Sequence, residues 1–227
     1  MKAMILCAGR GERMRPLTDI SPKPLLQVGG KPLVQYHIEK LAQAGVTEIV
    51  INHAWLGEKI EQTLGDGSQW GVNIQYSAEA KALETAGGII KALPLLGDES
   101  FIIVNGDVWS DYPFEQLLLI KPKAAHLVLV TNPEQHPQGD FSLNDSGHIS
   151  AQGDKKFTYS GISVLNPLLF SELEVGRMPL APLLRQAMDA QQVSGELYYG
   201  DWVDVGTPER LTRLDESVRK RIKGVLE

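Results

Sequence analysis

The sequence contains a single cysteine, Cys7, among its 227 residues. One thiol can neither form an internal disulfide nor supply the several cysteines of a structural zinc site. The expected location is therefore a reducing compartment, the cytoplasm. Long apolar runs are also missing, since no stretch approaches the ~20 residues of a membrane span. The apolar run near the N-terminus ends at Gly9 and Arg10, so we expect no signal peptide.

An excess of positive charge is missing as well. The chain has 28 acidic and 22 basic residues, and its formal net charge is −6. Nucleic-acid-binding proteins usually present a basic face, so neither nucleic acid nor a membrane is an expected partner. The length suffices for one sizeable core. We expect a single domain, 1–227, that is a monomer or a small homo-oligomer.

Short apolar runs alternate with helical patterns in the first half of the chain. Runs typical of buried strands lie at 3–7, 48–52, 72–76 and 101–105, with helical patterns between them from Pro32 to Gly45, near 56–64 and near 84–93. Alternating strands and helices with short connections favour a parallel sheet covered by helices on both faces. The predicted class is α/β, a Rossmann-like doubly wound, mostly parallel sheet.

The second half has a different pattern. Strands are predicted at 126–130 and 157–165, a hairpin around the turn residues 144–147, and helices near 179–190 and 208–220. No linker or repeat separates the two halves. We expect a nucleotide-binding half, about 1–110, and a sugar-phosphate-binding half, about 111–227.

The segment "LCAGRGERMRPLTDISPKPL" at 6–25 carries several positive charges directly behind the first predicted strand. Open α/β sheets bind ligands beyond the carboxyl ends of their strands. Gly9 and Gly11 let backbone N–H groups approach phosphate oxygens, and Arg13 and Arg15 can place guanidinium groups on them. Lys23 lies between two prolines, which restrict the backbone around it. The segment predicts a site for an anion rather than a flexible basic loop.

Two other nucleotide-binding motifs do not fit. Met14 occupies the third glycine position of the dinucleotide fingerprint G-x-G-x-x-G, and "VGGKPL" lacks the spacing of a Walker loop. The segment instead resembles the signature of sugar-1-phosphate nucleotidylyltransferases, L-x-G-G-x-G-x-R-L-x-P-L-T followed by P-K-P, and departs from it at Ala8. This resemblance implies Arg13 and Lys23 as catalytic cations. It implies a nucleotide-binding set of Gly9, Gly11, Glu12, Arg13 and Lys23.

The same resemblance assigns two aspartates to a metal ion. "NGD" places Asp107 after a predicted strand, "DWVDVGT" places Asp204 before a predicted helix, and both match metal-binding segments of the family. Either aspartate alone is also compatible with a turn or a helix cap. They are 97 positions apart (204 − 107), so only the fold can bring them together. The expected cofactor is Mg²⁺, which binds phosphates together with one or two carboxylates.

Further segments suggest contacts to the base and the sugar. "YSAEAKALETAGGI" resembles the base-contacting region of the family and implies Ala80 and Ala82, with Glu84 where glycine is common; a plain helix start is the alternative. "QGDKKF" stands where the family often has E-K-P, so Asp154 and Lys155 are candidates to replace it. His37 and Cys7 are interpreted as packing residues. The expected sugar-phosphate contacts are Asn105, Gly139, Asp140, Tyr159, Gly161 and Trp202.

The implied reaction transfers a nucleotidyl group from a nucleoside triphosphate to a sugar 1-phosphate and releases pyrophosphate. "LETAGGI" and "VNGDVWSDY" look most like members that use UTP and N-acetylmuramate α-1-phosphate in bacterial cell-wall recycling. Lys155 or Lys156 can then meet the acidic ether of that sugar. Mannose 1-phosphate with GTP and glucose 1-phosphate with dTTP are alternatives. A non-catalytic nucleotide-sugar sensor is an alternative of another class.

Overall fold

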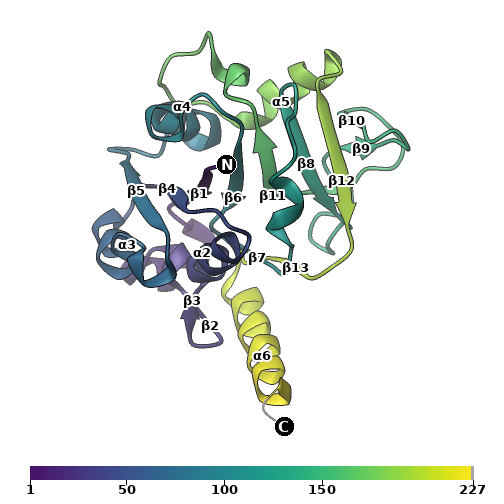
Figure 1. Cartoon of the computed structure of the whole chain (residues 1–227). Helices are drawn as coiled ribbons and strands as arrows, with labels where there is room; N and C mark the ends of the chain where they lie inside the picture. Colours follow the sequence, from purple (N-terminus) through teal and green to yellow (C-terminus); the bar gives the residue numbers. More distant parts are fainter. Residues whose placement is uncertain (226–227) are drawn as a thin grey trace.

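The computed structural model describes residues 1–225, and this part of the chain contains a seven-stranded sheet to which both halves contribute (Figure 1). The parallel strands β6, β1, β4 and β5 form one part of the sheet, and β11 runs antiparallel to its neighbours β6 and β8. The edge strand β12 is parallel to β8. The predicted α/β class with a mostly parallel sheet is confirmed. In sheet order the strands are β12 (Val193–Tyr198), β8 (Ala125–Val130), β11 (Thr158–Leu165), β6 (Phe101–Asn105), β1 (Ala3–Leu6), β4 (Glu48–His53) and β5 (Asn73–Ala78).

Helices cover both faces of the sheet. Successive side chains of a strand point to opposite faces, and in β1 they divide between two apolar cores. Ile5 contributes to the core under α2 (Leu33–Gln43) and α3 (Gly57–Leu64). Met4 contributes to the core under α4 (Glu84–Leu96) and α5 (Leu180–Asp189). The central strand is therefore buried on both sides, which explains its continuous apolar sequence.

The order of the strands reverses direction at β1. The chain passes from β1 to β4 and β5 on one side and then returns to β6 on the other side. The carboxyl ends of β1 and β6 consequently lie side by side, with Leu6 in register with Asn105. Such a reversal leaves a crevice at which open α/β sheets bind ligands.

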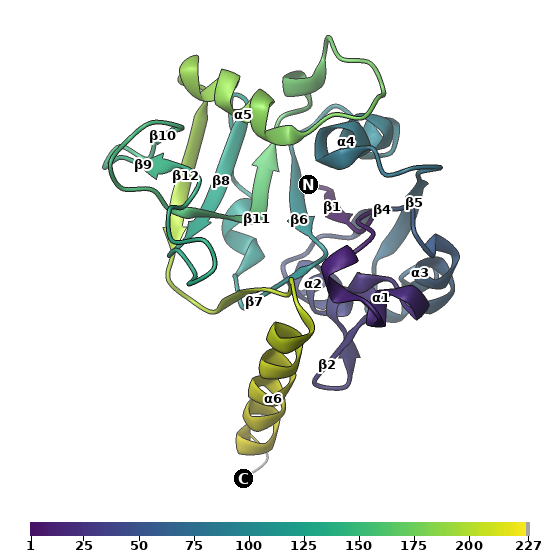
Figure 2. The ribbon, with the colours of Figure 1, turned by 180° about the vertical axis from the view of Figure 1, so that it is seen from behind.

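Smaller elements surround this crevice. The segment before α2 contains the short helix α1 (Leu17–Ile20), visible in Figure 2, and the hairpin strands β2 (Gln27–Val28) and β3 (Lys31–Pro32). The predicted hairpin around 144–147 is confirmed by β9 (Ser142–Leu143) and β10 (Ile149–Ser150). Strand β7 (Val108–Ser110) pairs with β13 (Trp202–Asp204) in an antiparallel ribbon. Helix α6 (Pro208–Val225) follows this ribbon.

Short 3₁₀ turns complete the chain. They cover Glu12–Met14, Lys23–Leu25, Ser68–Trp70, Phe114–Leu117 and Pro167–Phe170. Within residues 1–225, none of the helices combines the length and the apolar character needed to cross a membrane.

Helix α6 projects away from the sheet beside the β2–β3 hairpin (Figure 1). Its start follows from "TP": the hydroxyl of Thr207 accepts a hydrogen bond from the N–H of Arg210 at 3.3 Å, and proline suits the first helical position. A carboxylate oxygen of Asp215 accepts a bond from the N–H of Gly29 at 2.7 Å. A Cβ at Gly29 would lie 2.6 Å from Cγ1 of Val218, so the contact between hairpin and helix requires glycine there.

Gly29 and Gly30 form a matched pair for testing this contact. Both have a positive φ, but a Cβ at Gly30 would meet open space. We expect Gly29→Ala to lower the free energy of unfolding by about 1–3 kcal/mol more than Gly30→Ala, because only the former forces α6 away from the hairpin. Urea unfolding of both variants measures the difference. Equal losses would show that the hairpin does not depend on the close approach of α6.

Candidate active site

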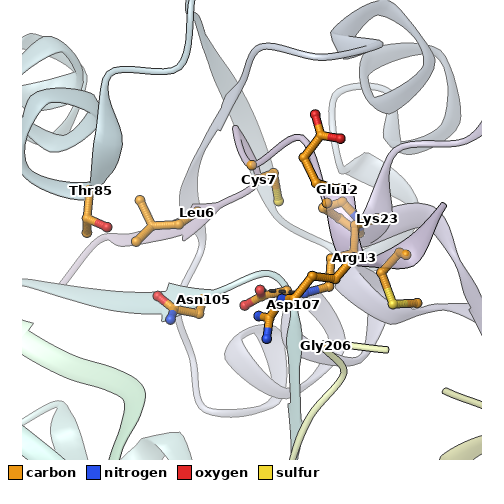
Figure 3. Close-up of a pocket in the computed structure, with 13 residues that line it drawn as sticks. Leu6, Cys7, Glu12, Arg13, Lys23, Thr85, Asn105, Asp107 and Gly206 are labelled. Carbon is orange, nitrogen blue, oxygen red and sulfur yellow. Dashed lines mark hydrogen bonds and ion pairs between the residues drawn. The ribbon is translucent and has the colours of Figure 1, made fainter. Parts of the chain in front are cut away.

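A cavity of about 350 Å³ lies at the carboxyl ends of β1 and β6, where the strand order reverses (Figure 3). The segment 6–25 contributes much of its lining, as its charge pattern predicts. The remaining walls come from α4, from the end of β6 and from the loop before α6. The lining residues are Leu6, Cys7, Gly9, Gly11, Glu12, Arg13, Met14, Lys23, Pro24, Thr85, Asn105, Asp107 and Gly206.

The loop that follows β1 is held by side-chain contacts. Gly11 adopts a left-handed φ of 67°, and its carbonyl accepts a hydrogen bond from the hydroxyl of Thr18 at 2.9 Å. Arg10 donates to the carbonyl of Thr18 at 2.8 Å and pairs with Asp19 at 2.7 Å. Its guanidinium also lies 4.0 Å from the ring centroid of Trp55. These contacts fix the loop, in agreement with the expectation that it is not a flexible basic segment.

The arginines of this loop have different surroundings. Arg15 lies 3.0 Å from a carboxylate oxygen of Glu12 and 3.3 Å from one of Asp19, so its charge is already paired. Arg13 lines the cavity and, within residues 1–225, makes no hydrogen bond or ion pair. Of the two arginines expected to face an anion, only Arg13 lines the cavity. Glu12 also lines the cavity, but its carboxylate points away from Asp107 (Figure 3).

Lys23 reaches the cavity from a buried position. Its side chain is 8% exposed, and its ammonium nitrogen lies 2.6 Å from Oδ2 of Asp107. The backbone approaches this point in an extended conformation at Pro22 and then forms a 3₁₀ turn over Lys23–Leu25. A cation held in this way is presented at one place, as the "PKP" sequence predicts. It has exchanged most of its hydration for a single carboxylate.

The β7–β13 ribbon brings the two predicted metal ligands together. Asp204 is in register with Val108, and the N–H of Val205 donates to the carbonyl of Asp107 at 3.0 Å. Both aspartates line a second cavity of about 220 Å³. Oδ2 of Asp204 pairs with Arg210 at 2.6 Å, so each carboxylate has a cationic partner.

The donor set of this region fits Mg²⁺ bound together with phosphates. Within residues 1–225 there is no group of three or more His, Cys, Asp and Glu side chains arranged around one point. A complete protein cage of the kind that holds structural zinc is therefore absent from the described chain. Mg²⁺ is commonly held by one or two carboxylates, with phosphates and water as the other ligands. Asp107 and Asp204 supply that number.

A third cavity, of about 310 Å³, adjoins the first on the side of β4. Ala82 lines it, whereas Ala80 is exposed and is not among its lining residues. Glu84 adopts a left-handed φ of 60° at the position where the family often has glycine. Its carboxylate pairs with Arg177 at 2.8 Å, and both residues line the cavity. A side chain therefore occupies a backbone conformation that favours glycine.

Sequence reasoning missed a buried hydrogen-bond chain behind this cavity. Oδ1 of Asn52 accepts from the N–H of Cys7 at 3.0 Å, and its Nδ2 donates to Glu79 at 2.7 Å. The other carboxylate oxygen of Glu79 accepts from the N–H of Leu83 at 2.8 Å. A Cβ at Gly88 would lie within 2.8 Å of both polar side chains. These hydrogen bonds join the ends of β1, β4 and β5 to the start of α4. In the sequence, the polar residues that end "EIVIN" and "YSAE" could have indicated them.

A fourth cavity, of about 410 Å³, lies between the end of β6 and α5. Asn105 is shared by this cavity and the two that contain Asp107. Asp140 and Tyr159, two of the expected sugar-phosphate contacts, line it. Oδ2 of Asp140 accepts from the N–H of Tyr159 at 2.8 Å, and burial raises the pKa of the Tyr159 hydroxyl to about 12. The contribution of α5 was not predicted.

The other predicted sugar contacts lie at different depths. Gly161 is buried behind Asn105, and a Cβ there would lie 2.5 Å from its Nδ2. Gly139 packs against Asn132 and the backbone of Lys156, and neither glycine is among the lining residues of this cavity. Trp202 donates to the carbonyl of Ser160 at 2.8 Å and lines the cavity of the two aspartates.

The two residues interpreted as packing residues are buried. Cys7 is 2% exposed and His37 is 1% exposed. Burial raises the pKa of the Cys7 thiol, and the charge of Asp107 raises it further. Burial lowers the pKa of His37 to about 4, and its Nε2 lies 2.8 Å from the carbonyl of Val108. Neither side chain is therefore placed as a nucleophile or a general base.

Comparison with known proteins agrees with this geometry. The family model "Nucleotidyl transferase" matches residues 2–149. N-acetylmuramate alpha-1-phosphate uridylyltransferase of Neisseria meningitidis is 54% identical over 220 residues, which cover 93% of this chain and 95% of that protein. The chain belongs to the nucleotidyl transferase family. The resemblance to sugar-1-phosphate nucleotidylyltransferases is confirmed, and the chain is an enzyme of that family.

More distant members share the fold and part of the sequence. A mannose-1-phosphate guanyltransferase of Gibberella zeae is 32% identical over 92% of this chain, which spans 62% of that protein. The solved structure of a glucose-1-phosphate thymidylyltransferase from Bacillus anthracis has a TM-score of 0.85 at 22% identity, and covers 96% of this chain and 95% of its own. An inositol-1-phosphate CTP transferase from T. maritima has a TM-score of 0.78 at 21% identity, with 98% and 96% covered. Members of the family use a nucleoside triphosphate, a sugar phosphate and, in general, a divalent metal ion.

The buried thiol in the wall of the cavity gives a direct test of the site geometry. We expect Cys7 in the native protein to react with iodoacetamide at least about 100-fold more slowly than in the urea-unfolded chain, because the thiolate is scarce and shielded. Mass spectrometry over a time course measures both rates. Similar rates would mean that the cavity wall opens at Cys7 on the timescale of the reaction.

Proposed function

We propose that this protein is a uridylyltransferase that converts UTP and N-acetylmuramate α-1-phosphate into UDP-N-acetylmuramate and pyrophosphate. The observation that carries this proposal is the 54% identity to the Neisseria meningitidis enzyme, which extends over 95% of that protein. We further propose that the chain is one domain with a nucleotide half and a sugar half. Its place is then cytoplasmic, where nucleoside triphosphates are made, in the recycling of cell-wall sugars.

The triphosphate is proposed to bind in the cavity at the end of β1. Gly9 leaves room for phosphates to approach the backbone, since a Cβ there would meet no atom within 4 Å. At Gly11 a Cβ would lie 3.0 Å from Cγ2 of Thr18, so the loop requires glycine there. Arg13, which is without an ion-pair partner in residues 1–225, can place its planar group on the phosphate oxygens. Lys23 lines the same cavity and supplies a point charge. Neutralising the charge that builds up on pyrophosphate is the main catalytic task of these two cations.

Asp107 and Asp204 are the residues that would hold Mg²⁺. They line one cavity, and the β7–β13 ribbon fixes their backbones against each other. A divalent ion held there would supply positive charge that offsets the repulsion between the phosphates of the two substrates. Lys23 is paired with one oxygen of the Asp107 carboxylate, and we propose that it turns from this oxygen toward the phosphates when the substrates bind. The same arrival of substrates therefore provides a new partner for each member of the ion pair.

The two remaining cavities have lining that suits the other substrate groups. The base is proposed to occupy the cavity beside Ala82 and Arg177, and Ala80 is expected to reach it through its backbone. The sugar is proposed to occupy the cavity beside Asp140 and Tyr159. Asn105 lines the junction between sugar and phosphate cavities.

The chemical step needs no nucleophile from the protein. An oxygen of the sugar phosphate forms a bond to the α-phosphorus of UTP. The bond from that phosphorus to the oxygen between the α- and β-phosphates breaks, and the β- and γ-phosphates leave as pyrophosphate. The protein contributes by positioning two anions in line and by neutralising their charge. No covalent intermediate is expected, in agreement with the burial of Cys7 and His37.

The proposed substrates are tested by a pyrophosphate-release screen of UTP, GTP, dTTP and CTP against several sugar 1-phosphates. We expect UTP with N-acetylmuramate α-1-phosphate to give the highest kcat/KM, followed by UTP with N-acetylglucosamine 1-phosphate. A preference for GTP with mannose 1-phosphate, or dTTP with glucose 1-phosphate, would replace the proposed substrates and leave nucleotidyl transfer in place. Nucleotide-sugar binding without pyrophosphate release from any pair would identify a sensor.

The metal assignment is tested by Asp107→Asn and Asp204→Asn. Each variant is expected to lower kcat at saturating Mg²⁺ by at least about 100-fold, because the phosphates lose part of their counter-charge. Asp201→Asn is the matched control, since Asp201 adjoins β13 but pairs with Arg221 at 2.7 Å. We expect the control to keep activity within about twofold of wild type. Full activity of either test variant would remove that aspartate from the metal site.

A further inference from the structure

Helix α5 forms one wall of the proposed sugar cavity. Leu180, Ala181, Leu184 and Arg185 line it, and this spacing places them on one face of the helix. Arg185 is exposed and, in the part of the chain that the structure describes, makes no hydrogen bond or ion pair. An arginine over a substrate cavity without a protein partner is available to an anionic group of the ligand.

The other charged groups of this cavity are already paired. The carboxylate of Glu84 lies 2.8 Å from Arg177. The carboxylate of Asp140 accepts from the N–H of Tyr159 at 2.8 Å and lies 3.1 Å from Nε2 of His136. Within residues 1–225, Arg185 is then the charged lining residue left without a partner. The cavity therefore combines a free guanidinium with an otherwise apolar α5 wall.

We propose that Arg185 binds the carboxylate of the lactyl ether of the sugar substrate and thereby selects it over neutral hexosamine phosphates. This inference rests on the proposed function, whose substrate differs from N-acetylglucosamine 1-phosphate in that acidic ether. A guanidinium can bind a carboxylate through two parallel N–H···O bonds, which gives both energy and orientation. Arg185 is a specificity-determining residue in this arrangement, remote from the reacting phosphates.

The lysines expected from the sequence to meet this ether are placed elsewhere. The ammonium nitrogen of Lys155 lies 5.2 Å from the ring centroid of Phe157, and neither Lys155 nor Lys156 is among the lining residues of the sugar cavity. The positive charge that the substrate requires is thus supplied by α5, which the sequence pattern predicted only as a helix near 179–190. The two assignments can be separated by mutation.

The test compares kcat/KM for three substrates with UTP: N-acetylmuramate α-1-phosphate, its lactyl methyl ester and N-acetylglucosamine 1-phosphate. We expect Arg185→Ala to lower kcat/KM for the first by at least about tenfold, chiefly through KM. The ester and N-acetylglucosamine 1-phosphate have no lactyl charge, so their values should change by less than about twofold. Arg185→Lys should keep part of the preference, because it retains the charge but loses the planar group.

Two control variants distinguish this role from a structural one. Gln186→Ala changes the next residue, which lines a separate groove on the outer side of α5, and is expected to leave all three substrates unaffected. Lys155→Ala is expected to leave the preference intact. If wild type shows no preference for N-acetylmuramate α-1-phosphate, both the inference and the proposed function are wrong. If wild type shows the preference and Arg185→Ala retains it, the role of Arg185 is wrong while the proposed function stands. The same holds if Lys155→Ala abolishes the preference.

Discussion

Lys23 and Asp107 are 84 positions apart in the chain and meet in an ion pair at 2.6 Å. A lysine as deeply buried as Lys23 needs a negative partner, because an unpaired charge at such a position costs several kcal/mol. Before substrates bind, that partner is Asp107. This single contact joins the loop after β1 to the end of β6, and so keeps the crevice between them in shape. It also holds the ammonium group of Lys23 and the carboxylate of Asp107 where a triphosphate and its metal ion are proposed to bind.

Two further connections keep the surroundings of the pair in place. On one side, the chain of bonds through Asn52 and Glu79 ties the end of β1 to the start of α4. On the other side, the β7–β13 ribbon carries Asp204 to Asp107. Buried polar networks of this kind favour one arrangement, because each unsatisfied group would cost about 1–3 kcal/mol. The proposed exchange of partners at the centre therefore needs movement of side chains only, within a backbone held from both sides.

The sequence predicted the fold and the loop that lines the cavity, because both depend on local patterns. Apolar runs identified strands β1, β4, β5 and β6, and "GRGERMR" and "PKP" identified the loop that lines the cavity. Contacts made by topology were harder to predict: β12 has the mixed sequence of an edge strand, and Asn52 and Glu79 resemble ordinary strand ends. Gly161 was assigned to the substrate from its sequence context, and the sequence did not indicate that a side chain there would clash with Asn105. Arg185 gave no signal, since a charge on an amphipathic helix usually faces solvent.

A double-mutant cycle on kcat/KM for UTP, with Lys23→Met, Asp107→Asn and both changes together, tests most directly whether the ion pair separates to serve the substrates. If Lys23 moves to the phosphates and Asp107 to the metal ion, each change removes a different contact in the transition state. The kcat/KM of the double variant is then expected to be no higher than that of the less active single variant. If the pair serves only to hold the loop, removing both charges leaves no unpaired buried group, and activity should recover above that of either single variant. Recovery of this kind would contradict the proposed exchange of partners.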